Sequence, residues 1–219
     1  MIAARRIFAS RDELAATLSA DVAARLADAI AARGDAVLAV SGGTTPKLLF
    51  AALSRTVIGW SRVTVTLVDE RCVEETSERS NARLVRENLL QDEAAKARFV
   101  PLYRNEEEAA ALDTFAVALF GMGTDGHTAS FFPGGDTLKE ALDMKSGKRV
   151  LKLEAHAAGE TRVTFTLPAL LESDFLALHI EGEDKRAAFE RAEADGPVEA
   201  MPIRAFIRAA APMTLYWCP

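Results

Sequence analysis

The sequence predicts an α/β fold, in which helices flank a mostly parallel, Rossmann-like sheet that carries a small antiparallel addition. Short, wholly apolar runs such as residues 37–40 alternate with helical patterns, as expected for parallel strands covered on both faces. Beyond residue 145, apolar residues at 150–153 and 163–167 alternate with polar ones, which is typical of half-exposed antiparallel strands. No repeat or composition break divides the chain, so we expect residues 1–219 to form a single domain.

The first long element is an amphipathic helix. Ser10 and Glu13 match a capping box, apolar side chains recur every fourth residue from Leu14 to Ile30, and Gly34 suits the position after the last turn. A buried strand at 37–40 then leads through adjacent glycines to a second helix.

The remaining elements follow in the same alternation. Pro46 is expected at the first position of the second helix, with Thr45 as its cap. Further helices are expected near residues 80–90, 106–110, 168–171 and 185–192. Further strands are expected at residues 63–68, 99–102, 115–120, 150–153, 163–167, 175–180 and 213–217.

Composition excludes several classes of protein. The formal net charge of −6 argues against general nucleic-acid binding, which needs a basic surface. No apolar run is long enough for a bilayer and no signal peptide is evident, so we expect a cytoplasmic protein with no membrane partner. Cys72 and Cys218 form neither a disulfide framework nor a zinc spacing, and no metal site is expected.

Ligands of such folds bind beyond the carboxyl ends of the parallel strands. Residues 41–45, 69–71, 121–127 and 182–185 all follow predicted strands and therefore share that place in the fold. An anionic small molecule could bind there, held by backbone N–H groups and local Arg or Lys side chains.

The loop that opens at Gly121 is the main candidate for chemistry. Gly121, Gly123 and Gly126 fit the spacing of a dinucleotide fingerprint, but Pro133 ends the long helix that this motif requires. We instead interpret His127 as a general base, because an imidazole with its ordinary pKa of ~6.5 can accept a proton at neutral pH. Asp125 would orient the ring, stabilise its charge or hold the reactive water.

The other two histidines carry less information. His179 lies inside an apolar strand and is interpreted as a hydrogen-bonded core residue, and nothing in the sequence assigns a role to His156.

The turn at residues 41–45 is a candidate phosphate site. It lacks the Gly-Lys-Ser/Thr ending of a P-loop, yet Ser41, Gly42, Gly43 and Thr44 offer hydroxyls and free N–H groups. Arg71 and Lys185 are placed at strand ends as phosphate partners. Cys72 beside Arg71 is considered as a nucleophile, but no second feature supports that hypothesis.

Together these motifs resemble the 6-phosphogluconolactonase branch of the glucosamine-6-phosphate isomerase/6-phosphogluconolactonase family. The resemblance covers nearly the whole chain in the family's order. It rests on residues 41–46, 69–71 with 80–81, 121–134, 162–168 and 182–185.

The resemblance implies hydrolysis of 6-phosphogluconolactone to 6-phosphogluconate in the oxidative pentose phosphate pathway, without metal or organic cofactor. Carried over by position, His127 activates water with Asp125 beside it, while Arg71, Lys185 and the Ser41 turn hold the phosphate. Arg162 is a further contributor to substrate binding. A sugar-phosphate lactone is then the partner, and we expect a monomer.

Two alternatives remain open. A glucosamine-6-phosphate deaminase or isomerase would carry Tyr at the position of Arg71 and a different run after His127. A non-catalytic sugar-phosphate sensing module would have no use for His127 and Asp125. One departure from the family pattern is a short connection between Leu102 and Phe115, which could alter one wall of the pocket.

Overall fold

The central sheet is parallel throughout. Within residues 1–155 and 159–219, which this computed structural model describes, seven strands follow the order β1-β10-β9-β6-β2-β3-β5. They are β1 (Ile2–Ile7), β2 (Ala36–Val40), β3 (Val63–Leu67), β5 (Arg98–Val100), β6 (Val117–Phe120), β9 (Leu176–Glu181) and β10 (Met213–Cys218). The predicted parallel sheet is therefore confirmed.

A second sheet is small and antiparallel, as the alternating segments predict. It has the order β4-β8-β7, with β4 (Asp69–Arg71), β8 (Glu160–Phe165) and β7 (Val150–Ala155). Val68 alone separates β3 from β4. Its N–H donates to the Val40 carbonyl of the large sheet, and its own carbonyl accepts from the Phe165 N–H of the small one. Asp69 therefore lies where the two sheets meet.

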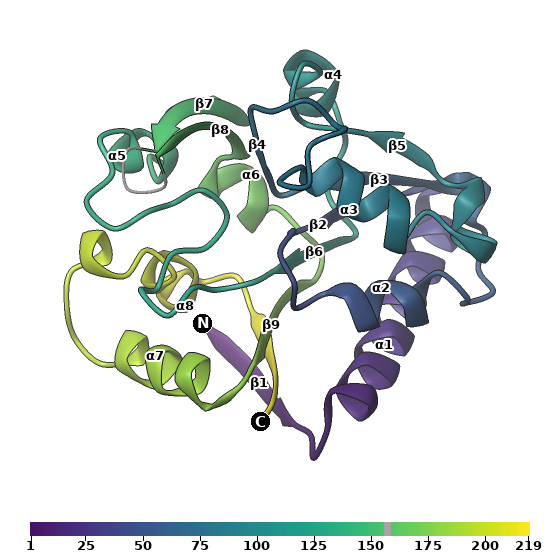
Figure 1. Cartoon of the computed structure of the whole chain (residues 1–219), viewed down its shortest axis with the longest axis horizontal. Coiled ribbons are helices and arrows are strands. Elements are labelled where there is room, and N and C mark those ends of the chain that lie inside the picture. Colours follow the sequence, from purple (N-terminus) through teal and green to yellow (C-terminus); the bar gives the residue numbers. More distant parts are fainter. Residues whose placement is uncertain (156–158) are drawn as a thin grey trace.

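Helices cover both faces of the parallel sheet (Figure 1), with α1 and α2 on one side and α7 and α8 on the other. The helices are α1 (Arg11–Arg33), α2 (Lys47–Leu53), α3 (Asn81–Asn88), α4 (Glu106–Ala110), α5 (Leu138–Ala141), α6 (Leu167–Leu171), α7 (Glu183–Glu193) and α8 (Arg204–Arg208). Short 3₁₀ turns occur at η1 (Trp60–Arg62), η2 (Asp92–Lys96) and η4 (Val198–Ala200).

Helix α1 forms where its caps and apolar period predict. The Ser10 hydroxyl accepts from the Glu13 N–H at 3.2 Å, and Gly34 takes a left-handed φ of 90° to end the helix. Leu14, Leu18 and Leu26 are fully buried, and burial of each such side chain stabilises the fold by about 2 kcal/mol.

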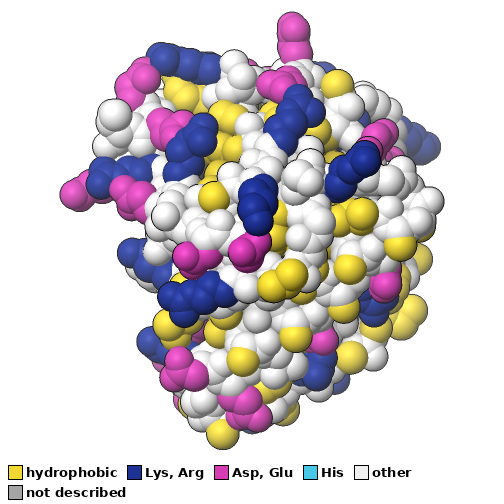
Figure 2. Space-filling model, turned by 90° about the vertical axis from the view of Figure 1, so that its right-hand side faces the viewer, with side chains coloured by type: hydrophobic (Ala, Val, Ile, Leu, Met, Phe, Trp, Pro, Cys, Tyr) yellow, Lys and Arg dark blue, Asp and Glu magenta, His cyan; other side chains and the backbone are white. Residues whose placement is uncertain are grey.

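On the face of the molecule seen in Figure 2, basic and acidic side chains are interspersed rather than gathered by sign.

The strand order places a switch point between β2 and β6. The chain runs from β2 to β3 and β5 on one side, whereas β6, β9 and β10 extend the sheet on the other. The loops that follow β2 and β6 therefore diverge and leave a crevice at the carboxyl edge.

No helix among the described residues is long and apolar enough to cross a membrane.

Several local expectations need correction. Pro46 occupies the cap position of α2 rather than its first turn, and Thr45 does not cap the helix. Thr45 Oγ1 instead accepts a hydrogen bond from Lys185. No sequence pattern predicted β1, α5 or α8, and β5 begins one residue earlier than expected. His156 lies outside the described residues.

A buried tyrosine ties β10 to α1. The Tyr216 hydroxyl donates to Asp21 Oδ2 at 2.6 Å, and burial together with Asp21 raises the pKa of the Tyr216 phenol. A raised pKa stabilises the fold below the phenol's unfolded pKa of ~10, and this contribution is lost as pH rises through the folded value.

Tyr216→Phe should therefore lower the free energy of unfolding by about 2 kcal/mol at neutral pH, because it removes a hydrogen bond to a charged carboxylate. The difference from wild type should narrow above pH ~10, where only the wild-type unfolded chain gains by ionising. Urea denaturation across this range measures both values. A difference that does not change with pH would contradict the assignment.

Candidate active site

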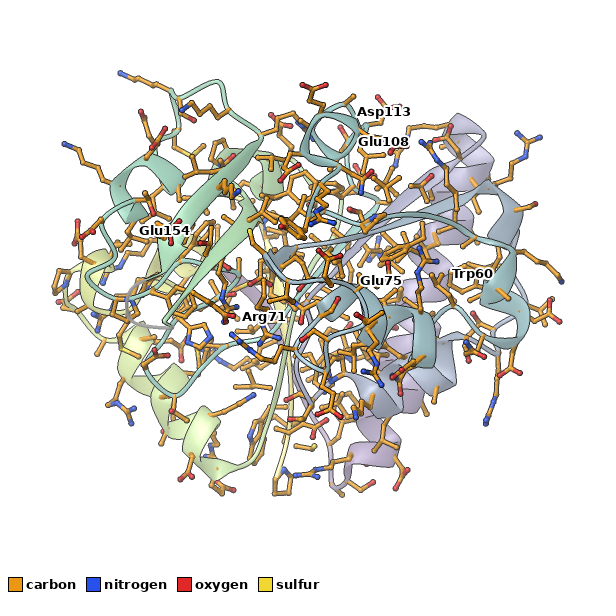
Figure 3. All side chains as sticks on the ribbon, turned by 45° about the horizontal axis from the view of Figure 1, so that its top comes forward. Trp60, Arg71, Glu75, Glu108, Asp113 and Glu154 are labelled. Carbon is orange, nitrogen blue, oxygen red and sulfur yellow. The ribbon has the colours of Figure 1, made fainter. Side chains whose placement is uncertain are left out.

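The predicted site residues meet in an open pocket at the switch point. Its lining includes Ser41, Gly42, Gly43, Thr44, Arg71, His127, Arg162 and Lys185. Figure 3 shows Arg71 near the middle of the molecule, on the short strand β4. Asp125 is exposed and is not part of this lining, but it contacts His127. The loops after β2, β3, β6 and β9 therefore converge as the strand order requires.

His127 and Asp125 form a hydrogen-bonded pair. His127 Nδ1 lies 2.6 Å from Asp125 Oδ1, and the same oxygen accepts from the His127 N–H at 3.1 Å. Burial acts to raise the pKa of Asp125, but the hydrogen bonds and charge of His127 outweigh it and lower that pKa. An ionised partner requires the proton on Nδ1, which leaves the Nε2 lone pair free to accept a proton.

Gly123 makes room for this pair. A Cβ at that position would come within 2.3 Å of His127 Nδ1 and 2.5 Å of Asp125 Oδ1. The imidazole and carboxylate therefore pack directly against the backbone of the loop. Gly121 differs, since a Cβ there would meet no heavy atom within 4 Å.

The turn after β2 is built for close approach. Gly43 has a φ of 94°, and a Cβ on Gly42 would overlap Asn81 Oδ1 at 1.9 Å. Asn81 is held there because its Nδ2 donates to the Asp69 carbonyl at 2.9 Å. Within the described residues, the N–H groups of Gly42, Gly43 and Thr44 donate to no protein acceptor. Such an array of free N–H groups suits an anion.

Lys185 reaches this turn from α7. Its Nζ donates to Thr45 Oγ1 at 3.2 Å. Burial lowers the pKa of Lys185, and the nearby Glu181 carboxylate opposes that effect. A bound anion would favour the charged form of the lysine, because it adds a second negative partner.

Arg71 and Arg162 stand opposite each other on β4 and β8. Burial and the like charge of Arg162 lower the pKa of Arg71. Arg162 NH1 lies 3.4 Å from Asp69 Oδ2, and NH2 donates to Glu160 Oε1 at 2.8 Å. Like charges across a strand pair are destabilising, so this arrangement is typical of a binding function rather than of stability.

Three pocket residues carry buried polar atoms without a partner. Among the described side chains, Ser41 Oγ, Arg71 Nε and Arg162 Nε make no hydrogen bond. Buried donors are nearly always paired in native proteins, so an unpaired cluster in one pocket indicates groups that a ligand satisfies. Two of these atoms belong to cations, which favours an anionic ligand.

Glu70 holds β4, which carries Arg71, against the start of α3. Its carboxylate accepts from the Ser80 hydroxyl and from the N–H groups of Arg71, Asn81 and Ala82, at 2.7 to 3.1 Å. Burial raises the pKa of Glu70, while the backbone hydrogen bonds act against that shift. Through these contacts α3 is anchored beside β4, and Asn81 is presented to the turn.

Several lining residues were not named as site residues by the sequence reasoning, among them Asp69, Asn81 and His179. His179 is buried and hydrogen-bonded to Glu181 at 3.0 Å, which agrees with a core histidine, yet it also borders the pocket. The available signal was the spacing of His179 and Glu181, which puts both side chains on one face of β9 at its carboxyl end.

Other chemistries have less support. Burial raises the pKa of the Cys72 thiol, which disfavours the thiolate that a nucleophile requires. Among the described residues, no group of three or more His, Cys, Asp or Glu side chains could hold a metal ion.

Comparisons with known proteins find relatives over nearly the whole chain. Residues 9–217 match the model of a family described as glucosamine-6-phosphate isomerases/6-phosphogluconolactonase. A 6-phosphogluconolactonase of Rhizobium meliloti (strain 1021) is 53% identical, with 100% of each chain covered. Another, from Mesorhizobium japonicum, is 53% identical over 97% of this chain and 94% of its own.

A solved structure has the same architecture. The crystal structure of a 6-phosphogluconolactonase from Shewanella baltica superposes with a TM-score of 0.94 at 37% identity. The match covers 99% of this chain and 97% of that one. The two-sheet arrangement, including the small antiparallel sheet beside the pocket, is thus that of a known fold.

The space beside Gly123 gives a direct test of the His127–Asp125 packing. Gly123→Ala should lower the free energy of unfolding by roughly 1–3 kcal/mol, because the new methyl group displaces both side chains. Gly121→Ala is the matched control, since its Cβ has open space, and it should stay within about 0.5 kcal/mol of wild type. Urea denaturation compares the two, and equal losses would contradict the packing argument.

Proposed function

The chain belongs to the glucosamine-6-phosphate isomerase/6-phosphogluconolactonase family, and from that premise we propose that it hydrolyses 6-phospho-D-glucono-1,5-lactone to 6-phosphogluconate. This is a step of the oxidative pentose phosphate pathway. The observation that carries the proposal is the unpaired set of Ser41 Oγ, Arg71 Nε and Arg162 Nε in the pocket that His127 also lines. An anion site and a base in one pocket fit a phosphorylated ester-like substrate.

The phosphate binds at the turn after β2. Free N–H groups of Gly42, Gly43 and Thr44 surround it, together with the Ser41 hydroxyl, Lys185 and Arg71. The lysine acts as a point charge, and the arginine offers directed donors. Because the phosphate is remote from the lactone carbonyl, its binding energy orients the reacting carbon. Arg162 contributes to substrate binding through the Nε that Asp69 and Glu160 leave free.

His127 supplies the base. Its Nε2 takes a proton from water while the water oxygen bonds to the lactone carbonyl carbon, and a tetrahedral oxyanion forms. When the ring C–O bond breaks, the imidazolium returns its proton to the departing ring oxygen, which becomes a hydroxyl of the open acid. Asp125 keeps the proton on Nδ1 and stabilises the transient imidazolium at 2.6 Å.

The alternatives have weaker support. In a deaminase or isomerase of this family we expect Tyr where the chain has Arg71, whose Nε is one of the unpaired donors in the pocket. A sensing module would need the anion site alone, whereas this pocket also contains the His127–Asp125 pair.

We expect the purified protein to accelerate 6-phosphogluconolactone hydrolysis above its spontaneous rate, equally with and without a chelator. His127→Ala should lower kcat by roughly 100- to 10,000-fold, the usual contribution of a general base. Binding of 6-phosphogluconate, measured by calorimetry, should remain, because the phosphate contacts are untouched.

Each outcome bears on a different part of the proposal. No acceleration by wild type would exclude the lactonase, and turnover of glucosamine 6-phosphate instead would favour the deaminase. A kcat for His127→Ala within about tenfold of wild type, a loss below ~1.4 kcal/mol, would exclude His127 as the essential base.

The lowered pKa of Lys185 predicts how phosphate binding depends on pH. A lysine binds a phosphate only while it is protonated, so affinity for 6-phosphogluconate should fall at a pH below the ordinary lysine pKa of ~10.4. Lys185→Arg keeps its charge throughout this range, because a guanidinium is not deprotonated there, and it should retain its affinity. Lys47→Arg is the control at an exposed lysine near the turn, and it should behave as wild type. An identical decline in all three proteins would argue against Lys185 as a phosphate ligand.

A further inference from the structure

Phe132 contacts two functional side chains at once. Its ring stacks on His127, with centroids 4.9 Å apart and planes inclined by 30°. The Arg162 guanidinium carbon lies 5.2 Å from the centroid of the same ring. Phe132 is buried but does not line the pocket, so it touches the site from behind.

The small sheet supports this ring. Phe132 packs with Leu153 in a hydrophobic cluster that is separate from the main core. Leu153 is the cross-strand partner of Arg162, so one pair of positions on β7 and β8 provides both contacts. The glycine-rich loop is therefore docked on the small sheet by its aromatic side chain.

A second connection runs parallel to the first. The Ser130 hydroxyl donates to Asp69 Oδ2 at 2.7 Å, and that oxygen also faces Arg162 NH1 at 3.4 Å. Between these contacts and His127, Ala129 takes a left-handed φ of 50°. A strained residue of this kind persists only where its surroundings hold it. The segment after His127 is thus attached to Arg162 by a polar contact and by an aromatic one.

We propose that Phe132 is a positioning residue, which fixes the plane of the His127 imidazole and its distance from Arg162. The inference rests on the proposed function and extends it to a residue that touches no substrate. The hydrogen bond to Asp125 restrains one nitrogen of the ring, and the stacked phenyl group restrains its plane. Both restraints are needed, because an error of about 1 Å in a reacting group lowers the rate by roughly 100-fold.

The test compares three variants of neighbouring positions. Phe132→Leu removes the ring and should lower kcat by roughly tenfold to 100-fold. Phe132→Tyr keeps the ring and should recover most of that loss. Phe131→Leu is the matched control, because Phe131 is fully buried and stacks on Phe206 rather than on a site residue. It should lower the melting temperature while kcat stays near that of wild type.

Binding and epistasis separate positioning from a general structural role. Affinity for inorganic phosphate should be unchanged in Phe132→Leu, since the aromatic contacts of the ring among the described side chains are to His127 and Arg162, and Arg162 remains held by Asp69 and Glu160. In a His127→Ala background, Phe132→Leu should cause little further loss of kcat, because its effect passes through His127.

The inference is overturned if Phe132→Leu keeps the wild-type kcat, if its loss is undiminished without His127, or if Phe131→Leu lowers kcat equally. It remains separable from the proposed function. If wild type does not hydrolyse the lactone, the function fails, whereas crystal structures of Phe132→Leu still report whether the His127 ring leaves its position. An unmoved ring would refute the positioning role.

Discussion

The geometry of the pocket depends on the buried carboxylate of Asp69. Asp69 Oδ2 accepts from the Ser130 hydroxyl and faces Arg162. The backbone carbonyl of the same residue accepts from Asn81 Nδ2 and so holds Asn81 against Gly42. One residue thus joins the glycine-rich loop, the small sheet and the turn after β2. A buried charge must be matched by partners, and the removal of one partner leaves it uncompensated at a cost of about 3–5 kcal/mol. The relative position of these three segments is therefore set by electrostatics as well as by packing.

The cationic side of the pocket works against the stability of the fold. Arg71 and Arg162 oppose each other across β4 and β8, and burial lowers the pKa of both Arg71 and Lys185. A bound dianionic phosphate would offset both the repulsion between the arginines and the cost of burying these cations, because it would supply negative charge and accept hydrogen bonds from the unpaired Nε atoms. The chain compensates with Glu70, Glu160 and Asp69, which engage the backbone and outer nitrogens while leaving inner donors free.

Sequence patterns predicted the elements whose burial is one-sided or complete. The apolar runs, of which the one in β9 also contains His179, correspond to β2, β6 and β9, and the four-residue apolar period corresponds to α1. Strand β1 was not predicted, because it lies at the edge of the sheet, where Arg5 and Arg6 are exposed and the sequence needs no apolar pattern. The positions of His127 and Lys185 in the pocket could be predicted because both residues follow the carboxyl ends of strands. The contacts of Asp69 and Phe132 could not be predicted. They depend on the passage of the chain from the large sheet to the small sheet at Val68 and on the pairing of β4 and β7 with β8, which joins segments distant in sequence.

The three glycines of the loop have uses unlike those of a dinucleotide fingerprint. Gly123 accommodates the His127–Asp125 pair, and Gly126 combines a φ of 82° with close packing on Met201. Gly121 accepts the Thr128 hydroxyl at its carbonyl, although its own Cβ position is open. The first helix after the loop is the four-residue α5, too short to direct a helix terminus at a pyrophosphate. The same spacing that suggests a dinucleotide site instead lets a histidine pack against backbone, and the proposed phosphate donors Gly42, Gly43 and Thr44 lie in the turn after the neighbouring strand β2. The switch point between β2 and β6 brings these two halves of the site together.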